Sequence, residues 1–147
     1  MWLRELHIEN CRLIDSLSTV WSPRVNWLIG ANASGKSSIL EALAILSRGR
    51  SFRTPRIQEV IRHGTKELTV AGKLCNEDNE PAEAYPLGIS KTAQQTRIRI
   101  NHADVAQQAE LSRHLPLTLI HPGSLDITSG SRTSACPTRL DCLLSCG

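Results

Sequence analysis

The pattern of apolar and polar positions along the chain predicts a mixture of strands and helices. Residues 3–9 alternate between apolar and polar side chains, which predicts a strand. Residues 20–21 are expected to pair with it in a hairpin whose turn lies at Asp15 and Ser16. The run 25–29 carries no charged residue and ends at a glycine, which is typical of a strand covered on both faces.

A helix and an antiparallel sheet are predicted after that run. Apolar residues dominate from Ser37 onward, which indicates a helix buried over most of its surface and ended by Gly49. The sheet is expected over residues 66–100. The other predicted elements are a turn at Gly64, a strand with Leu68, Val70, Gly72 and Leu74 on one face, an exposed turn at 76–81, strands at 85–89 and 96–100, a helix at 105–115 and a last strand at 117–120.

Composition is that of an ordinary globular protein. Apolar residues make up 40% of the 147 residues and charged residues 21%. The net charge of +3 permits a nucleic-acid partner without requiring one. No apolar stretch reaches the length needed to span a membrane, and five cysteines without paired spacing favour a reducing compartment. We therefore expect a cytoplasmic protein with no membrane partner.

The segment that follows the run 25–29 carries the candidate chemistry. Its pattern is G-x-x-x-x-G-K-S, from Gly30 to Ser37. Glycines let the backbone bring its N–H groups close to phosphate oxygens, and the following helix directs its positive end at the same charge. Lys36 is expected to reach the β- and γ-phosphates, and the Ser37 hydroxyl to ligate Mg²⁺. The predicted cofactors are ATP and Mg²⁺. The predicted binding residues are Gly30, Ala31, Asn32, Ala33, Ser34, Gly35, Lys36, Ser37 and Ser38.

The form of this loop narrows the class of protein. It resembles the G-x-N-G-x-G-K-[ST] loop of ABC-type and SMC-like ATPases, with Ala33 where those proteins usually have glycine. If Ala33 must adopt a positive φ, strain of about 1 kcal/mol follows and nucleotide affinity is reduced.

Four further segments resemble the RecF family, which consists of bacterial recombination-mediator ATPases built on an SMC-like head. Residues 3–12 resemble its first strand and the turn that follows, and residues 38–42 resemble the helix after its nucleotide loop. The sequence of residues 49–54, GRSFRT, is similar to its SFR segment. Residues 119–126 are similar to a later strand and turn of that family. The resemblance runs in register from residue 1 to about residue 128.

This resemblance implies a fold and a function. The implied fold is α/β, the N-terminal lobe of a P-loop NTPase head of the ABC/SMC type. The implied function is ATP-dependent DNA binding in replication, recombinational repair and the SOS response. It also implies single-stranded or gapped DNA, an ATP-dependent homodimer, and RecO and RecR as partners. Arg50, Arg53 and Arg56 are candidate contacts to DNA phosphates, and the alternative is that they are solvated or paired within the protein.

The sequence also departs from this family. Neither the signature motif nor the apolar strand ending in Asp-Glu is found, so no catalytic residue is assigned and ATP hydrolysis stays open. Residues 129–147 lack the family's pattern, so we divide the chain into a lobe at 1–128 and a divergent, poorly folded segment at 129–147. A frameshifted or truncated gene product is one hypothesis. The alternative functions are a P-loop enzyme of the kinase type acting on small molecules, and a non-functional remnant.

Overall fold

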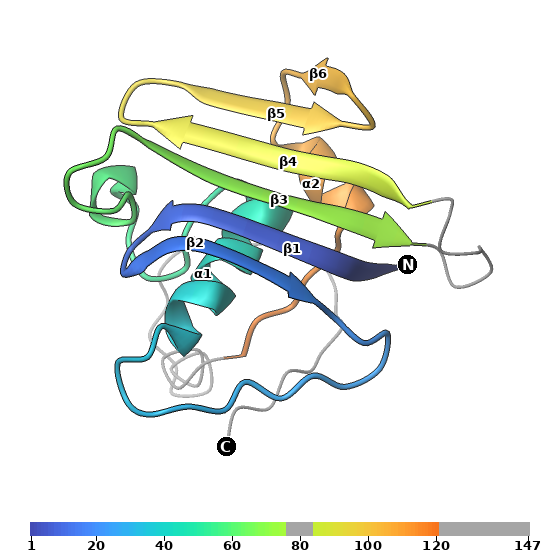
Figure 1. The fold of residues 1–147 in the computed structure, drawn as a ribbon. Helices are drawn as coiled ribbons and strands as arrows, with labels where there is room; N and C mark the ends of the chain where they lie inside the picture. The colour runs from blue at the N-terminus through green and yellow to red at the C-terminus, as the bar shows by residue number, and fades with distance from the viewer. Residues whose placement is uncertain (76–83, 121–147) are drawn as a thin grey trace, which may run out of the picture. The chain divides into compact units, whose positions relative to one another are not determined.

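The computed structural model describes residues 1–75 and 84–120, and all its helices and strands lie within the compact unit Met1–Pro116 (Figure 1). The elements in chain order are β1 (Trp2–Cys11), β2 (Ile14–Val20), α1 (Lys36–Arg48), the 3₁₀ turn η1 (Ile57–Glu59), β3 (Glu67–Cys75), β4 (Tyr85–Thr92), β5 (Thr96–Ile100), β6 (Ala103–Val105) and α2 (Ala109–His114). The predicted α/β class and the antiparallel sheet are therefore confirmed, and the sheet extends to both sides of the predicted range.

The strands form one antiparallel sheet in the order β2-β1-β3-β4-β5-β6. The predicted hairpin of the first two strands is present, but its turn is not at Asp15 and Ser16. Ser16 pairs with Glu9 inside the hairpin, and the last pair joins Cys11 to Ile14. The turn lies earlier because Arg12 adopts a left-handed conformation with φ 54°, which reverses the chain at once.

The core lies between one face of the sheet and the two helices (Figure 1). Alternate strand residues are buried in this core, as the period of two in the strands predicts. Every residue of α1 from 41 to 47 is buried, which confirms a helix covered over most of its surface. The fully buried side chains include Leu6, Ile8, Ile45, Leu46, Leu68, Val70, Leu74, Leu87 and Ile89. The predicted face of β3 is confirmed, since three of its four residues are in this core and Gly72 is the fourth.

Gly72 is required by a close approach of β1 and α1. A Cβ atom at this position would lie 2.5 Å from Leu3 Cδ1, 3.0 Å from the Glu5 carbonyl oxygen and 3.2 Å from Leu46 Cδ2. The pairing of β1 with β3 shifts register between Leu3 and Glu5, and this bulge lets Leu3 approach the helix side of the sheet.

Three predicted elements differ in the structure. Residues 25–29 form no strand, and Val25, Trp27 and Ile29 are 64%, 80% and 90% exposed, because no described strand pairs with this segment. The predicted helix at 105–115 is shorter and spans only 109–114, since Asn101 and His102 form a left-handed turn that leads into β6 instead. Residues 117–120 are described but form no strand.

The ends of α1 agree with the sequence prediction, and Gly49 caps this helix with φ 70°. The predicted turn at 76–81 and the segment 129–147 lie outside the described residues. None of the helices in the described part of the chain is long and apolar enough to cross a membrane.

Candidate nucleotide-binding site

The loop from Gly30 to Gly35 is shaped by residues in left-handed backbone conformations. Ala33 has φ 62° and Gly35 has φ 95°, so the positive φ considered for Ala33 is found. Gly30 is constrained differently, since a Cβ atom there would lie 2.8 Å from Ser34 Oγ. Rotation of the Ser34 side chain would relieve that contact, whereas the φ of Gly35 itself favours glycine and Ala33 carries strain of about 1 kcal/mol.

The first turn of α1 presents unused hydrogen-bond donors. The N–H groups of Ser38 and Ile39 donate to the Gly35 carbonyl, both at 3.0 Å, while those of Lys36 and Ser37 have no backbone partner among the described residues. The turn has no side-chain cap and no acidic residue. The positive end of the helix dipole is therefore not neutralised by the loop itself, which suits an anion placed there.

The Lys36 side chain folds back across the loop. Its ammonium group donates to the carbonyl oxygens of Gly30 at 2.7 Å and Ala31 at 2.8 Å. No ion pair in the described part of the chain joins Lys36 to a carboxylate. The Lys36 side chain and the unpaired N–H groups of Lys36 and Ser37 thus belong to one short stretch, to which the exposed Ser37 adds a hydroxyl. The donors present fit a polyphosphate and an associated Mg²⁺.

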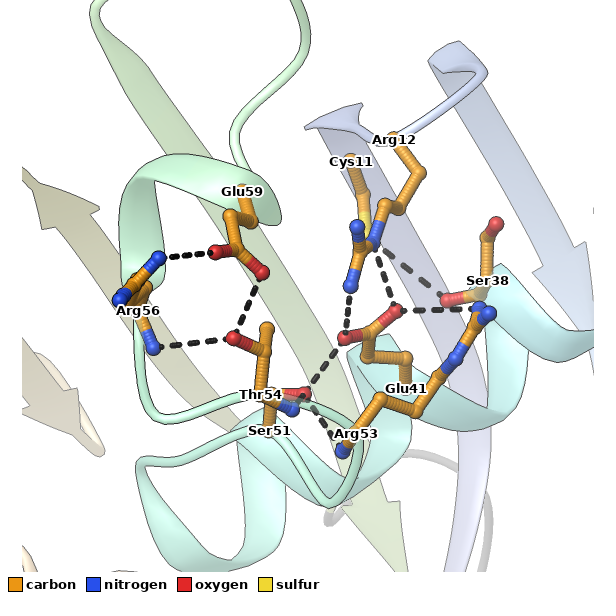
Figure 2. Close-up of polar contacts among 9 residues, drawn as sticks. All are labelled: Cys11, Arg12, Ser38, Glu41, Ser51, Arg53, Thr54, Arg56 and Glu59. Carbon is orange, nitrogen blue, oxygen red and sulfur yellow. Dashed lines mark hydrogen bonds and ion pairs between the residues drawn. The ribbon is translucent and has the colours of Figure 1, made fainter.

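A second cluster lies one and a half turns further along α1, around the fully buried carboxylate of Glu41 (Figure 2). Arg12 binds it with two nearly parallel hydrogen bonds, from Nε to Oε2 and from Nη2 to Oε1, both at 3.0 Å. Ser51 donates its hydroxyl to Oε1 at 2.5 Å. Hydrogen bonding to Glu41 raises the pKa of Arg12. This arrangement joins the β1–β2 turn, the helix and the segment after it.

The predicted DNA-contacting arginines lie on that last segment. Arg53 approaches Glu41 at 3.7 Å with one nitrogen and leaves 48% of its side chain exposed. Arg56 pairs with Glu59 at 3.4 Å and is 77% exposed, while Arg50 is exposed beside the segment's start. Arg53 and Arg56 thus have a partner within the protein, as the alternative interpretation expected (Figure 2). All three arginines are nevertheless exposed.

The two clusters are in physical contact. Cys11 lies beneath the start of α1 and its thiol donates to the Ser38 carbonyl at 3.8 Å. Burial, aided by the nearby Glu41 carboxylate, raises the pKa of this thiol to about 12, so it is neutral. From the next strand, Ile14 lies 3.7 Å from the Cβ position of Gly35. The β1–β2 turn therefore supports both the nucleotide loop and the Glu41 cluster.

Sequence reasoning placed the loop residues correctly along the chain but did not identify Glu41 as an anchor. Its one signal is an acid within the apolar run 39–46, a position that burial forbids without a partner. The partners could not be named, because Arg12 and Ser51 are separated from Glu41 by 29 and 10 residues. Arg12 lies in the β1–β2 turn, and Asn10 lies near the end of β1 with φ 56°.

Comparison with known proteins gives related sequences and structures. The family model described as RecF/RecN/SMC N terminal domain matches residues 2–135. The DNA replication and repair proteins RecF of Marinobacter nauticus and of Klebsiella pneumoniae subsp. pneumoniae are 39% and 38% identical to this chain. Each alignment covers 88% of this chain and 36% of the relative, so the chain spans little more than a third of their length.

Solved structures show the same fold. A structure of the recombination mediator protein RecF with ATP superimposes with a TM-score of 0.77 at 25% identity, over 86% of this chain and 34% of that one. A structure from work on ATP-driven dimerization and DNA-stimulated activation of SMC ATPases gives a TM-score of 0.74 at 19% identity. The match covers 90% of this chain and 93% of that one. The fold is that of a P-loop NTPase head of the ABC/SMC type. The chain belongs to the RecF/RecN/SMC N terminal domain family.

Proposed function

We propose that residues 1–128 form the N-terminal lobe of a RecF-type ATP-binding head that acts on DNA in replication and recombinational repair. The observation that carries this proposal is the loop 30–37, with its uncapped helix start and its Lys36 ammonium free of any described carboxylate. The family match and the RecF relatives support it. Residues 129–147 are proposed to be a divergent segment outside this lobe.

The bound nucleotide is proposed to be ATP with Mg²⁺. The N–H groups of residues 31–37 and the Lys36 ammonium hold the phosphates, and the Ser37 hydroxyl is the protein's ligand to the metal ion. When bound, Mg²⁺ neutralises part of the phosphate charge. Lys36 exchanges its two carbonyl contacts for phosphate oxygens, which are stronger acceptors because they are charged.

The DNA contacts are proposed for Arg50, Arg53 and Arg56, whose guanidinium groups bind phosphates without reading sequence. Single-stranded or gapped DNA is the proposed substrate, with an ATP-dependent homodimer and the partners RecO and RecR. The proposed place of action is the cytoplasm, as part of the response to DNA damage. These properties belong to the whole RecF-type protein, of which this chain corresponds to the first third.

The nucleotide proposal is tested by titrating the folded chain with a fluorescent ATP analogue and Mg²⁺. The Lys36→Ala variant is expected to bind about 10- to 100-fold more weakly, because a charge-assisted contact contributes about 1.5–3 kcal/mol. Lys73→Ala is the matched control, since Lys73 pairs with Glu5 on the surface of β3. Absence of binding to wild-type protein that is folded by circular dichroism would refute the proposal, as would equal binding by both variants.

The DNA proposal is tested with a labelled gapped oligonucleotide at several salt concentrations, with and without ATP. Arg50→Ala should weaken binding and lower the slope of log K against log salt by about one phosphate contact. Arg99→Ala is the control. Arg99 lies on β5, near the edge of the sheet formed by β6, and pairs there with Asp104 of β6. Equal effects of the two substitutions would contradict a specific role for the segment 50–56.

A further inference from the structure

Figure 1 shows that β3 begins and β4 turns into β5 at the same end of the sheet. An open depression lies there, between residues 58–66 and residues 92–94. Its volume is about 580 Å³. One wall is the segment from Gln58 through Lys66, and the other is the tight turn that follows β4. The lining residues are Gln58, Ile61, Arg62, His63, Gly64, Thr65, Lys66, Thr92, Ala93 and Gln94. None of them belongs to the nucleotide loop or to the Glu41 cluster.

Every ionisable residue that lines the depression is basic. Arg62 donates to the Leu13 carbonyl at 3.3 Å and lies 3.7 Å from Asp15, whose side chain is 79% exposed, so its charge is only partly balanced. Lys66 has no ion pair with any residue that the structure describes. His63 adds a third group that is cationic when protonated. The side-chain amides of Gln58 and Gln94 supply uncharged donors around them.

The basic wall is fixed to the rest of the fold by backbone hydrogen bonds. The Arg12 N–H donates to the Val60 carbonyl at 2.8 Å, and the Arg62 N–H donates to the Asn10 carbonyl at 2.9 Å. Gly64, with φ 87°, turns the chain between them and β3, and the Thr65 hydroxyl closes that turn on the Arg62 carbonyl at 2.8 Å. The basic side chains therefore project from a rigid backbone, which lowers the entropy lost when a ligand binds.

The opposite wall is equally ordered. The Thr92 hydroxyl accepts hydrogen bonds from the N–H groups of Gln94 at 3.3 Å and Gln95 at 3.0 Å. The Thr92 N–H donates to the Gln95 carbonyl at 2.9 Å. These bonds fix the turn and hold Gln94 at the rim of the depression. A wide, shallow and polar site of this kind fits a chain of phosphate groups better than a small apolar ligand, which needs an enclosed cavity.

We infer that this depression binds the phosphodiester backbone of DNA, with Lys66 and Arg62 as the contacting cations. The inference rests on the proposed function and extends it to a second surface. The arginine segment 50–56 leads directly through η1 into the wall of the depression, so one DNA strand can follow both. The contacts are to phosphates, so they add affinity without sequence preference.

The experiment compares Lys66→Ala with Lys73→Ala, two substitutions that each remove one exposed lysine next to or within β3, at its opposite ends. Binding of a labelled single-stranded oligonucleotide is measured across salt concentrations, and fluorescent ATP binding is measured on the same preparations. Lys66→Ala is expected to weaken DNA binding about 3- to 10-fold and to lower the salt slope by about 0.7, the value for one phosphate contact on a single strand. Lys73→Ala should leave both unchanged, and ATP binding should be the same in all three proteins.

A charge reversal, Lys66→Glu against Lys73→Glu, should enlarge the difference between the two positions. If wild-type protein binds DNA and both lysine positions give equal affinities and salt slopes, the depression is not a DNA contact, while the proposed function survives. If Lys66→Ala also lowers ATP affinity by the same factor, the effect is not specific to DNA and the inference fails. Absence of DNA binding by the wild-type protein would refute the proposed function and this inference together.

Discussion

The helix α1 and the run 25–29 are both rich in apolar residues, yet their surroundings are opposite. In α1, Ile45 and Leu46 are fully buried against the sheet. In the run before the nucleotide loop, Trp27 and Ile29 are 80% and 90% exposed. The difference shows that an apolar run in the sequence does not by itself predict burial. Burial also requires that the described part of the chain places another apolar surface against the run.

The sharpest way to break this comparison is to make the same substitution in both segments. Ile45→Ala should lower the free energy of unfolding by about 2–5 kcal/mol, because it removes buried methyl groups and leaves a cavity. Ile29→Ala should change it by less than about 0.5 kcal/mol. Urea denaturation followed by circular dichroism measures both. A large loss with Ile29→Ala would show that the run is packed against another surface in solution.

The second comparison is between a buried and an exposed carboxylate, Glu41 of α1 and Glu5 of β1. Glu41→Gln should destabilise the fold by about 3 kcal/mol, since it leaves the Arg12 guanidinium without its counter-charge in a partly buried site. Glu5→Gln is the control, because Glu5 pairs with Lys73 at the surface and such pairs contribute less than about 1 kcal/mol. Equal melting temperatures for the two variants would mean that the cluster contributes no stability.

A third comparison concerns the two glycines of the central strands. Gly72→Ala should cost about 1–3 kcal/mol, because its Cβ would overlap Leu3 and approach the Glu5 carbonyl. At Gly88 the nearest atoms to a Cβ lie 3.8 and 3.9 Å away, so Gly88→Ala should be tolerated. Thermal unfolding distinguishes them. A stable Gly72→Ala protein would show that the contact between β1 and α1 is loose.

The smallest expected effect concerns the strained residue of the nucleotide loop. Ala33→Gly should stabilise the loop by about 1 kcal/mol and tighten nucleotide binding up to fivefold, since glycine adopts a positive φ without penalty. Ala31→Gly serves as the control, because Ala31 has no positive φ and gains nothing from the change. Titration with the fluorescent ATP analogue compares the two. Weaker binding by Ala33→Gly would indicate that the alanine pre-organises the loop.

Features of the fold that depend on local pattern could be predicted from the sequence. The alternation in β3 and β5 and the glycines that bound α1 predicted those elements with nearly the observed limits. The short strand β6 could not be predicted, because it depends on left-handed conformations at Asn101 and His102 that apolar periodicity does not reveal. Whether residues 25–29 are buried depends on segments that are distant in the sequence, so the local pattern of apolar residues cannot predict it.

The candidate site likewise has one part that the sequence predicts and another that it does not. The loop 30–37 is contiguous, so its spacing identifies it in the sequence, and its resemblance to loops with glycine at position 33 raised the positive φ that Ala33 adopts. The pairing of Arg12 with Glu41 brings together two residues that are 29 positions apart in the chain, and it depends on how α1 packs against the sheet, which the local sequence does not reveal. The depression beside η1 was missed for the same reason, since its walls come from segments about 30 residues apart.

The position of β1 beside β3 has a consequence for how the chain reaches this structure. Glu9 pairs with Thr69, so the hairpin partner β2, the nucleotide loop and α1 all lie within a single excursion between neighbouring strands. Closing so long a loop costs conformational entropy, and this cost arises before the hydrogen bonds between β1 and β3 can form. We therefore expect the β1–β3 ladder to form more slowly than the β1–β2 hairpin, whose strands are neighbours in the sequence.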